Sequence, residues 1–277
     1  MKQIHNTGKG VAQDGYSELI VHIDGDTVWV MMNPSSRQCM TVGMLTELLN
    51  LLNGLDKSNI SFLVLASAHD EIFNSGGDLQ YFTELISLQN KELLIDYARL
   101  CTDLIYWGMT GGKRNITTIA CVAGDALGGG FEAALACKYL VAERQAVFSL
   151  PEVRFGLFPG MGGLALFAMR AGIKEADIAF STGKVYTSRE LYDLGLVCAI
   201  SETGNSLDEV RHFIKKRQLN SAANNALQKL RSRMQSIQYK DLIYNMDIWV
   251  EHVLQMTTKD LRRMKYLISK QHERVGE

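Results

Sequence analysis

A run of three glycines that leads into an Ala/Leu-rich segment constrains the fold of this chain more than any other feature. Gly128–Gly130 follow the apolar run 116–123 and continue into Phe131-Glu132-Ala133-Ala134-Leu135. Glycine permits a tight turn, while alanine and leucine favour a helix, so this pattern predicts a loop that opens a helix. The first N–H groups of a helix lack partners within it, and with the helix dipole they can bind an anion. We therefore expect an anion or oxyanion site at Gly129, with Glu132 beside it in the first helical turn.

A second glutamate, twenty positions after the first, is also set in a glycine-marked turn. Glu152 follows Pro151 in the segment Leu-Pro-Glu-Val-Arg-Phe-Gly-Leu-Phe-Pro-Gly-Met-Gly-Gly, residues 150–163. Each glutamate alone can be explained as an acid that complements a helix dipole, with Pro151 at the first helical position. Two carboxylates around one anion site can instead divide acid and base roles. Their conjunction favours an acyl-thioester enzyme.

A third glycine turn, Asn74-Ser75-Gly76-Gly77-Asp78, follows an apolar segment. It has a plain interpretation as a β-turn whose glycines adopt positive φ. Its functional interpretation is that Gly77 presents a second backbone N–H, which together with that of Gly129 would stabilise a thioester carbonyl as it becomes enolate-like. A phosphate loop is excluded because no Gly-Lys-Ser/Thr follows the glycine run. Gly160-Met161-Gly162 is a weak dinucleotide fingerprint, since it follows a Pro/Gly-rich turn rather than a strand.

The composition is that of an ordinary soluble globular protein of 277 residues, 47% apolar, with a formal net charge of −1. Residues 211–277 hold 14 Lys and Arg against 6 Asp and Glu, a balance of +8 that leaves −9 for residues 1–210. This basic end could meet a phosphate-bearing cofactor or an acidic carrier protein, or simply be a solvated helix face. Five scattered cysteines without a CxxC motif predict buried, reduced thiols and no metal site. Without a signal peptide or a long apolar run, we expect a cytoplasmic protein with no membrane span.

Strand and helix patterns alternate along most of the chain. The alternation predicts an α/β core with parallel pairing, followed by an α-helical C-terminal region. From about residue 190 the pattern is almost wholly helical, and the change to basic sequence near 205–220 marks a plausible boundary. The expected strands are 18–22 and 27–32 (a hairpin), 61–67, 116–123, 139–143 and 147–150; the expected helices are 42–55 and a long stretch from the 74–78 turn to about 110.

The three motifs, in this order and at this spacing, resemble the crotonase (enoyl-CoA hydratase/isomerase) superfamily. The resemblance implies a crotonase-type ββα spiral core over residues 1–210. It also implies a helical C-terminal region over 211–277 that serves oligomerisation and covers the acyl pocket, usually in a homotrimer or a dimer of trimers. Carried over by position, Glu132 and Glu152 match the two catalytic carboxylates of the family, and Gly77 and Gly129 match its oxyanion-hole amides.

A narrower resemblance is to the bacterial diffusible signal factor synthases. It rests on the sequences of the three motifs and on a late stretch from Ile248 to Leu267. It implies a 3-hydroxyacyl-acyl carrier protein dehydratase with thioesterase activity, which produces a cis-2-unsaturated fatty acid signal. The chain also departs from ordinary hydratases at Met32–Ser35, at Phe131 and at Gly163–Ala165.

The acyl tail is expected in an apolar pocket, and each candidate pocket residue could equally belong to the ordinary core. No metal or redox cofactor is implied, because the phosphopantetheine arm arrives on the substrate, which is a thioester of acyl carrier protein or CoA. One alternative is an enoyl-CoA hydratase/isomerase that acts on CoA thioesters. Another is a non-catalytic crotonase-fold protein that binds, for example, RNA, but both glutamates weigh against it, and we expect no nucleic-acid partner. The candidate substrate-binding residues are Gly128, Phe131, Met161, Trp249 and Leu267.

Overall fold

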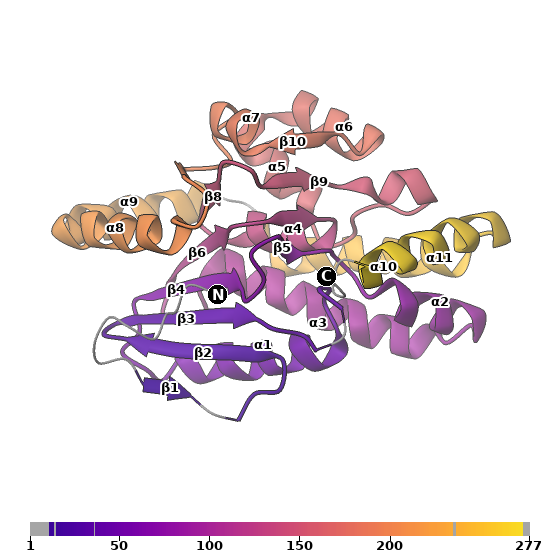
Figure 1. Ribbon diagram of the computed structural model, residues 1–277, viewed down its shortest axis with the longest axis horizontal. Coiled ribbons are helices and arrows are strands. Elements are labelled where there is room, and N and C mark those ends of the chain that lie inside the picture. Colours follow the sequence, from indigo (N-terminus) through magenta and orange to yellow (C-terminus); the bar gives the residue numbers. More distant parts are fainter. Residues whose placement is uncertain (1–10, 14, 36, 235–236, 274–277) are drawn as a thin grey trace.

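The computed structural model describes residues 11–13, 15–35, 37–234 and 237–273, which form two sheets surrounded by helices (Figure 1). The larger sheet has the spatial order β1 (Val11–Gln13), β2 (Leu19–Asp24), β3 (Thr27–Met32), β4 (Phe62–Ser67), β6 (Thr117–Val122), β8 (Tyr139–Glu143) and β11 (Ala199–Ser201). The smaller sheet has the order β10 (Val185–Thr187), β9 (Val147–Ser149), β7 (Asp125–Leu127) and β5 (Ile72–Asn74). From β3 to β11 the larger sheet is parallel, as the alternation of strands and helices predicts.

Three successive strand pairs each step from the larger sheet to the smaller one. β4, β6 and β8 are neighbours in the larger sheet, and the strands that follow them, β5, β7 and β9, are neighbours in the smaller sheet. Each pair leads to a helix, so the chain forms the spiral of ββα units that the resemblance implied. The expected α/β fold with C-terminal helices is confirmed. Because β5, β7 and β9 are parallel, the turns that follow them gather at one edge.

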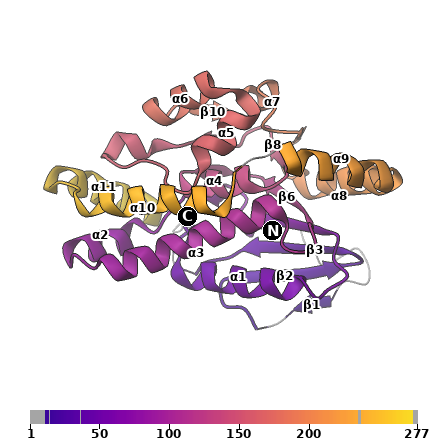
Figure 2. The same cartoon turned by 180° about the vertical axis from the view of Figure 1, so that it is seen from behind.

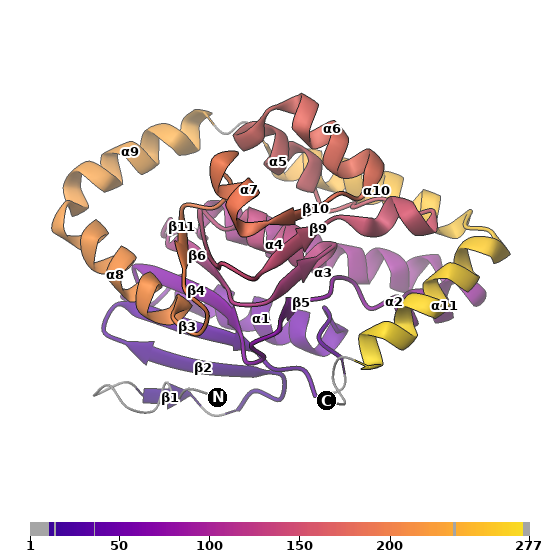
Figure 3. The same ribbon diagram turned by 45° about the horizontal axis from the view of Figure 1, so that its top comes forward.

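The helices cover both faces of the larger sheet. α10 packs against α3 behind the sheet (Figure 2), α11 packs against α2 and η2, and α8 packs against β6, β8 and β11. α8 and α9 form an outer arm beside β11 (Figure 3). The helices are α1 (Val42–Leu55), α2 (Leu79–Ser87), α3 (Lys91–Thr110), α4 (Gly129–Ala136), the 3₁₀ helix η2 (Pro151–Phe155), α5 (Gly163–Ala171), α6 (Ile173–Thr182), α7 (Ser188–Asp193), α8 (Ser206–Leu219), α9 (Ser221–Met234), α10 (Tyr239–Leu254) and α11 (Thr258–Glu273).

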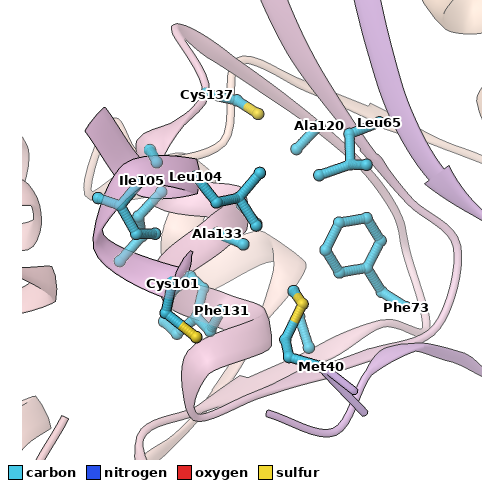
Figure 4. Packing of buried hydrophobic residues seen from close by; sticks show 14 of the residues in the cluster. Met40, Leu65, Phe73, Cys101, Leu104, Ile105, Ala120, Phe131, Ala133 and Cys137 are labelled. Carbon is cyan, nitrogen blue, oxygen red and sulfur yellow. The ribbon is translucent and has the colours of Figure 1, made fainter. Parts of the chain in front are cut away.

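The core lies mainly between the larger sheet and helices α1, α3 and α4. All six residues of β6 are buried, as expected for a parallel strand that is covered on both faces. Ala133 of α4 and Cys137, the residue after its end, are packed with Leu65 of β4 and Ala120 of β6 (Figure 4). The small side chains on α4 let this helix approach the sheet closely, and this approach places the start of α4 at the edge where the glycine turns meet.

The helix predicted over 42–55 is confirmed, and its N-cap Thr41 accepts a hydrogen bond from the Met44 N–H. The single long helix expected up to residue 110 is wrong, because the chain breaks between α2 and α3. Gln89 has φ +50°, and Asn90 then caps α3 by accepting from the Leu93 N–H. The expectation of buried thiols holds for four cysteines, but Cys198 is exposed.

The expected division of the chain at residue 210 falls inside α8. Val210 and Ile214 of this helix are buried against Trp29 and Val64 of the larger sheet. The division into 1–210 and 211–277 therefore stays a prediction. In the described residues no helix combines the length and the apolarity needed to cross a bilayer.

Candidate active site

The three glycine-marked turns meet at one cavity with a volume of about 170 Å³. Gly77, Gly129, Glu132 and Glu152 all line it, although they are spread over 76 positions of the sequence. The parallel pairing of β5 with β7 and of β7 with β9 brings their turns together. The rest of the wall is mostly apolar and includes Leu79, Phe82, Leu127, Phe155, Phe158 and Trp249.

The amides of Gly77 and Gly129 are close neighbours. A Cβ atom on Gly129 would lie 3.6 Å from the Gly77 nitrogen, and one on Gly76 would lie 3.2 Å from the Gly129 nitrogen. Gly76 has φ +97° and Gly128 has φ +51°, conformations that favour glycine. These conformations set the orientation of the Gly77 and Gly129 amides. Gly129 is the first residue of α4, so its N–H has no intrahelical acceptor. The pair can therefore donate two hydrogen bonds to one oxyanion.

Glu132 lies in the first turn of α4 and is only 1% exposed. Its Oε1 accepts hydrogen bonds from the backbone N–H of Met161 at 3.1 Å and of Gly163 at 2.9 Å. Burial raises the pKa of Glu132 to about 7, against the lowering effect of these two bonds. Glu132 thus faces the cavity and also fixes the 160–163 turn.

Glu152, the second residue of η2, has fewer partners. Its Oε2 is buried and makes no hydrogen bond within the described part of the chain. Burial, followed by the charge of nearby Glu132, raises the pKa of Glu152 to about 8. A Cβ atom on Gly128 would lie 2.5 Å from Glu152 Oε1, so only glycine leaves room for the carboxylate beside the start of α4. The two backbone donors favour the anion of Glu132, and the lack of one at Glu152 Oε2 favours its protonated form, an arrangement that suits an acid and base pair.

Three of the expected pocket residues line the cavity: Gly128, Met161 and Trp249. Trp249 comes from α10 and packs directly on the turn of the second motif. A Cβ atom on Gly160 would lie 2.3 Å from Trp249 Cδ1, so this contact needs glycine. Leu267 belongs to α11, but its side chain lies outside the described part of the structure.

Phe131, expected in the pocket, does not line the cavity. Adjacent residues of a helix point about 100° apart, so Phe131 points into the core when Glu132 faces the cavity. Phe131 is fully buried, with its ring 5.1 Å from that of Phe148 and 6.2 Å from that of Phe167. Figure 4 shows it among other buried core side chains.

The sequence interpretation missed several cavity residues. Phe155 lies inside the second motif, and its apolar character close to Glu152 was a usable signal. Phe82 follows the Gly77 turn by five positions, on the face of α2 that becomes buried. Gln38 gave no signal, because it reaches the cavity only through the packing of the 37–40 segment beside the 74–78 turn.

Comparison with known proteins places this geometry in context. The model of the enoyl-CoA hydratase/isomerase family matches residues 27–267. A probable enoyl-CoA hydratase of Rhizobium meliloti (strain 1021) is 27% identical over 195 residues, which are 70% of this chain and 72% of that protein. An enoyl-CoA isomerase/hydratase of Penicillium crustosum, claC, is 32% identical over 167 residues; the match covers 59% of this chain but only 18% of that protein.

Solved structures share the fold at low identity. An enoyl-CoA hydratase from Bacillus halodurans superposes with a TM-score of 0.78 and 23% identity, covering 90% of this chain and all of that one. Pseudomonas aeruginosa DspI superposes with a TM-score of 0.67 and 24% identity, covering 80% of this chain and 88% of that one. The family model spans the strands, turns and helices that build the cavity. The chain belongs to the enoyl-CoA hydratase/isomerase family.

Proposed function

We propose that this protein adds water reversibly to the C2–C3 double bond of a 2-enoyl thioester. The observation that carries the proposal is the pair of buried carboxylates, unequal in hydrogen bonding, beside the neighbouring amides of Gly77 and Gly129. A protein that only binds a ligand has no need of two buried acids at an oxyanion site. The family match supports this hydratase alternative more strongly than the expectation of a signal synthase.

Each group then has a defined task. The thioester oxygen accepts hydrogen bonds from the two glycine amides, which stabilise the negative charge that develops there. Glu132, the more readily ionised acid, takes a proton from the water whose oxygen bonds to C3. Glu152 delivers its proton to C2, so the elements of one water molecule are added. Dehydration of a 3-hydroxyacyl thioester follows the same steps in reverse.

The cavity supports a short apolar tail. Its 170 Å³ is close to the roughly 150 Å³ of an engineered apolar cavity that holds benzene. Next to it lies a surface hollow lined by Lys259, Arg262 and Arg263 of α11 and by Arg154. Phe155 lines both this hollow and the catalytic cavity. These cations favour an anionic carrier such as CoA or phosphopantetheinylated acyl carrier protein.

The direct test is to incubate the protein with crotonyl-CoA and hex-2-enoyl-CoA and to follow the loss of enoyl-thioester absorbance. Mass spectrometry should identify the 3-hydroxyacyl thioester. If neither thioester is hydrated and 3-hydroxybutyryl-CoA is not dehydrated, the proposal is wrong.

The signal-synthase expectation remains a second candidate. It is favoured by the mostly apolar wall around Glu152, which suits an acyl tail, and by the motif sequences. In this reaction the protein would dehydrate a 3-hydroxyacyl-acyl carrier protein and then hydrolyse the thioester. Release of a free cis-2-enoic acid from that substrate, detected by mass spectrometry, would favour this candidate. An enoyl product that stays attached to its carrier would favour the hydratase.

A further inference from the structure

The hydroxyl group of Tyr97 joins the two backbone segments that form the Gly77 side of the cavity. Tyr97 lies in the first half of α3, outside the three glycine motifs. Its Oη accepts a hydrogen bond from the Asp78 N–H at 3.2 Å and donates one to the Met40 carbonyl at 2.6 Å. The hydroxyl is thus a bridge between the residue after Gly77 and the segment that lies alongside.

This segment and the glycine turn are also held together by an ion pair between Arg37 and Asp78 at 2.8 Å and by backbone bonds. The Ser75 N–H donates to the Gln38 carbonyl at 2.6 Å, and the Met40 N–H donates to the Gly76 carbonyl at 2.8 Å. Met40 and Gly77 form an isolated parallel bridge. In such a bridge the Asp78 N–H faces the Met40 carbonyl. The Tyr97 hydroxyl bonds to both of these groups and so fixes their positions.

We infer that Tyr97 is a positioning residue for the oxyanion hole, an inference that rests on the proposed function. The peptide between Gly77 and Asp78 is held by the hydroxyl, so its orientation sets the conformation of Gly77 and the direction of the Gly77 N–H. Without the hydroxyl, the Asp78 N–H and the Met40 carbonyl lose their common partner, and the Gly77–Asp78 peptide can reorient. The protein would stay folded, but its oxyanion donor would be displaced.

The surroundings of Tyr97 make it a rigid support. The side chain is 1% exposed, and its ring contacts those of Tyr81 and Phe82 at centroid distances of 5.8 and 5.0 Å. Phe82 also contacts Trp249 at 5.1 Å and lies so close to Gly77 that a Cβ there would be 2.7 Å from Phe82 Cε2. Burial raises the pKa of Tyr97 well above its usual value, so the hydroxyl keeps its proton and stays a donor to Met40.

The test compares Tyr97→Phe with a matched control, Tyr186→Phe. Tyr186 is also 1% exposed, and its hydroxyl donates to Glu175 Oε1 at 2.9 Å, away from the cavity. The probe is 2,4-hexadienoyl-CoA, whose absorbance shifts to longer wavelength when its carbonyl is polarised. We expect Tyr97→Phe to reduce this shift. It should also lower kcat for crotonyl-CoA about 10- to 100-fold, with little change in KM, because an oxyanion donor displaced by about an ångström stabilises the transition state less. Tyr186→Phe should keep the wild-type shift and kcat.

The outcomes distinguish failure of the proposed function from failure of the positioning role of Tyr97. If the wild-type protein does not shift the probe and does not hydrate crotonyl-CoA, the proposed function fails, and the role of Tyr97 fails with it. If the wild type shifts the probe and Tyr97→Phe shifts it equally with unchanged kcat, the positioning role alone is overturned. If Tyr97→Phe does not fold, 3,5-difluorotyrosine at position 97 keeps the ring and the hydroxyl but weakens the hydroxyl as an acceptor. A smaller shift then supports the role, and an equal shift overturns it.

Discussion

At the scale of single residues, Glu132 and Glu152 differ in the hydrogen bonds that reach them. Both are buried, which raises both pKa values. Two backbone donors favour the anion of Glu132, whereas Glu152 Oε2 accepts no hydrogen bond in the described structure. This difference in hydrogen bonding favours Glu132 as the base and Glu152 as the acid.

Replacing either glutamate with glutamine tests this division. We expect Glu132→Gln and Glu152→Gln each to lower kcat for hydration by about 10²–10⁴-fold, the usual contribution of a general acid or base. Glutamine is preferred to alanine because Glu132 Oε1 accepts bonds from Met161 and Gly163, and an amide oxygen can still accept them. Kinetics with crotonyl-CoA, together with circular dichroism, check the result. A folded variant with near wild-type turnover would remove that residue from the mechanism.

The raised pKa of Glu152 also predicts how stability changes with pH. An acid with a folded-state pKa of about 8 and an ordinary value of 4.5 binds its proton more tightly when folded. It therefore contributes stability that is complete below pH 4.5 and is lost as pH rises toward 8. Glu152→Gln has no carboxyl group to titrate, so it does not lose this stability. Its Tm should be close to that of the wild type at pH 4.5 and higher than that of the wild type at pH 8. Each pKa unit corresponds to about 1.4 kcal/mol, so the gain is on the order of a few kcal/mol.

Thermal unfolding at pH 4.5, 6 and 8 measures this difference. Glu251→Gln removes an exposed carboxylate of α10 and is the control for the change from glutamate to glutamine. A Tm difference between Glu152→Gln and the wild type that stays constant with pH would mean that Glu152 is not held protonated.

At the scale of elements, the start of α4 depends on one glycine conformation. Gly128 has φ +51°, and its added Cβ would lie 2.5 Å from Glu152 Oε1. Gly128→Ala should therefore lower the free energy of unfolding by about 1–3 kcal/mol and reduce hydration activity. Gly54→Ala, in the last turn of α1, is the control, since a Cβ there meets nothing within 4 Å and alanine favours a helix over glycine by at most about 0.5–1 kcal/mol. Urea unfolding of both variants checks the prediction, and equal stability of Gly128→Ala and wild type would contradict it.

Elements with strong local signals could be predicted from the sequence. α1 has a threonine cap and leucines at helical spacing, and α4 has a glycine run before small apolar residues. The break at Gln89 could not be predicted, because no glycine or proline interrupts the helical pattern there. β5 and β7 have three residues each, and their pairing with one another defines them more than their side chains do.

The same distinction explains which parts of the site the sequence indicated. Both carboxylates and both amides lie in local motifs whose residue types reveal their chemistry. Phe82 and Tyr97 reach the site only because α2 and α3 fold back beside the Gly77 turn. Phe131 was misplaced because the direction of a helical side chain depends on which face meets the core, and a motif match does not give that face.

At the scale of the whole molecule, the outer arm carries exposed apolar side chains that the single chain does not cover. Leu227 and Leu230 of α9 are 52% and 63% exposed, and Leu219 at the end of α8 is 78% exposed. Exposed apolar side chains gathered on one arm are typical of a subunit contact. They support the expected homotrimer or dimer of trimers, which stays a prediction.

The assembly can be tested by size-exclusion chromatography with light scattering. We expect the wild type to have the mass of three or six chains. The double variant Leu227→Glu/Leu230→Glu should shift toward smaller species at micromolar concentration, because a charge buried in an apolar contact loses its hydration. Leu88→Glu changes an equally apolar side chain, 74% exposed, at the junction of α2 and α3, and should leave the mass unchanged. If the Leu227→Glu/Leu230→Glu variant keeps the wild-type mass, the arm is not the contact. If the wild type is a monomer with full hydratase activity, the catalytic cavity is complete in one chain and the expected trimer is wrong.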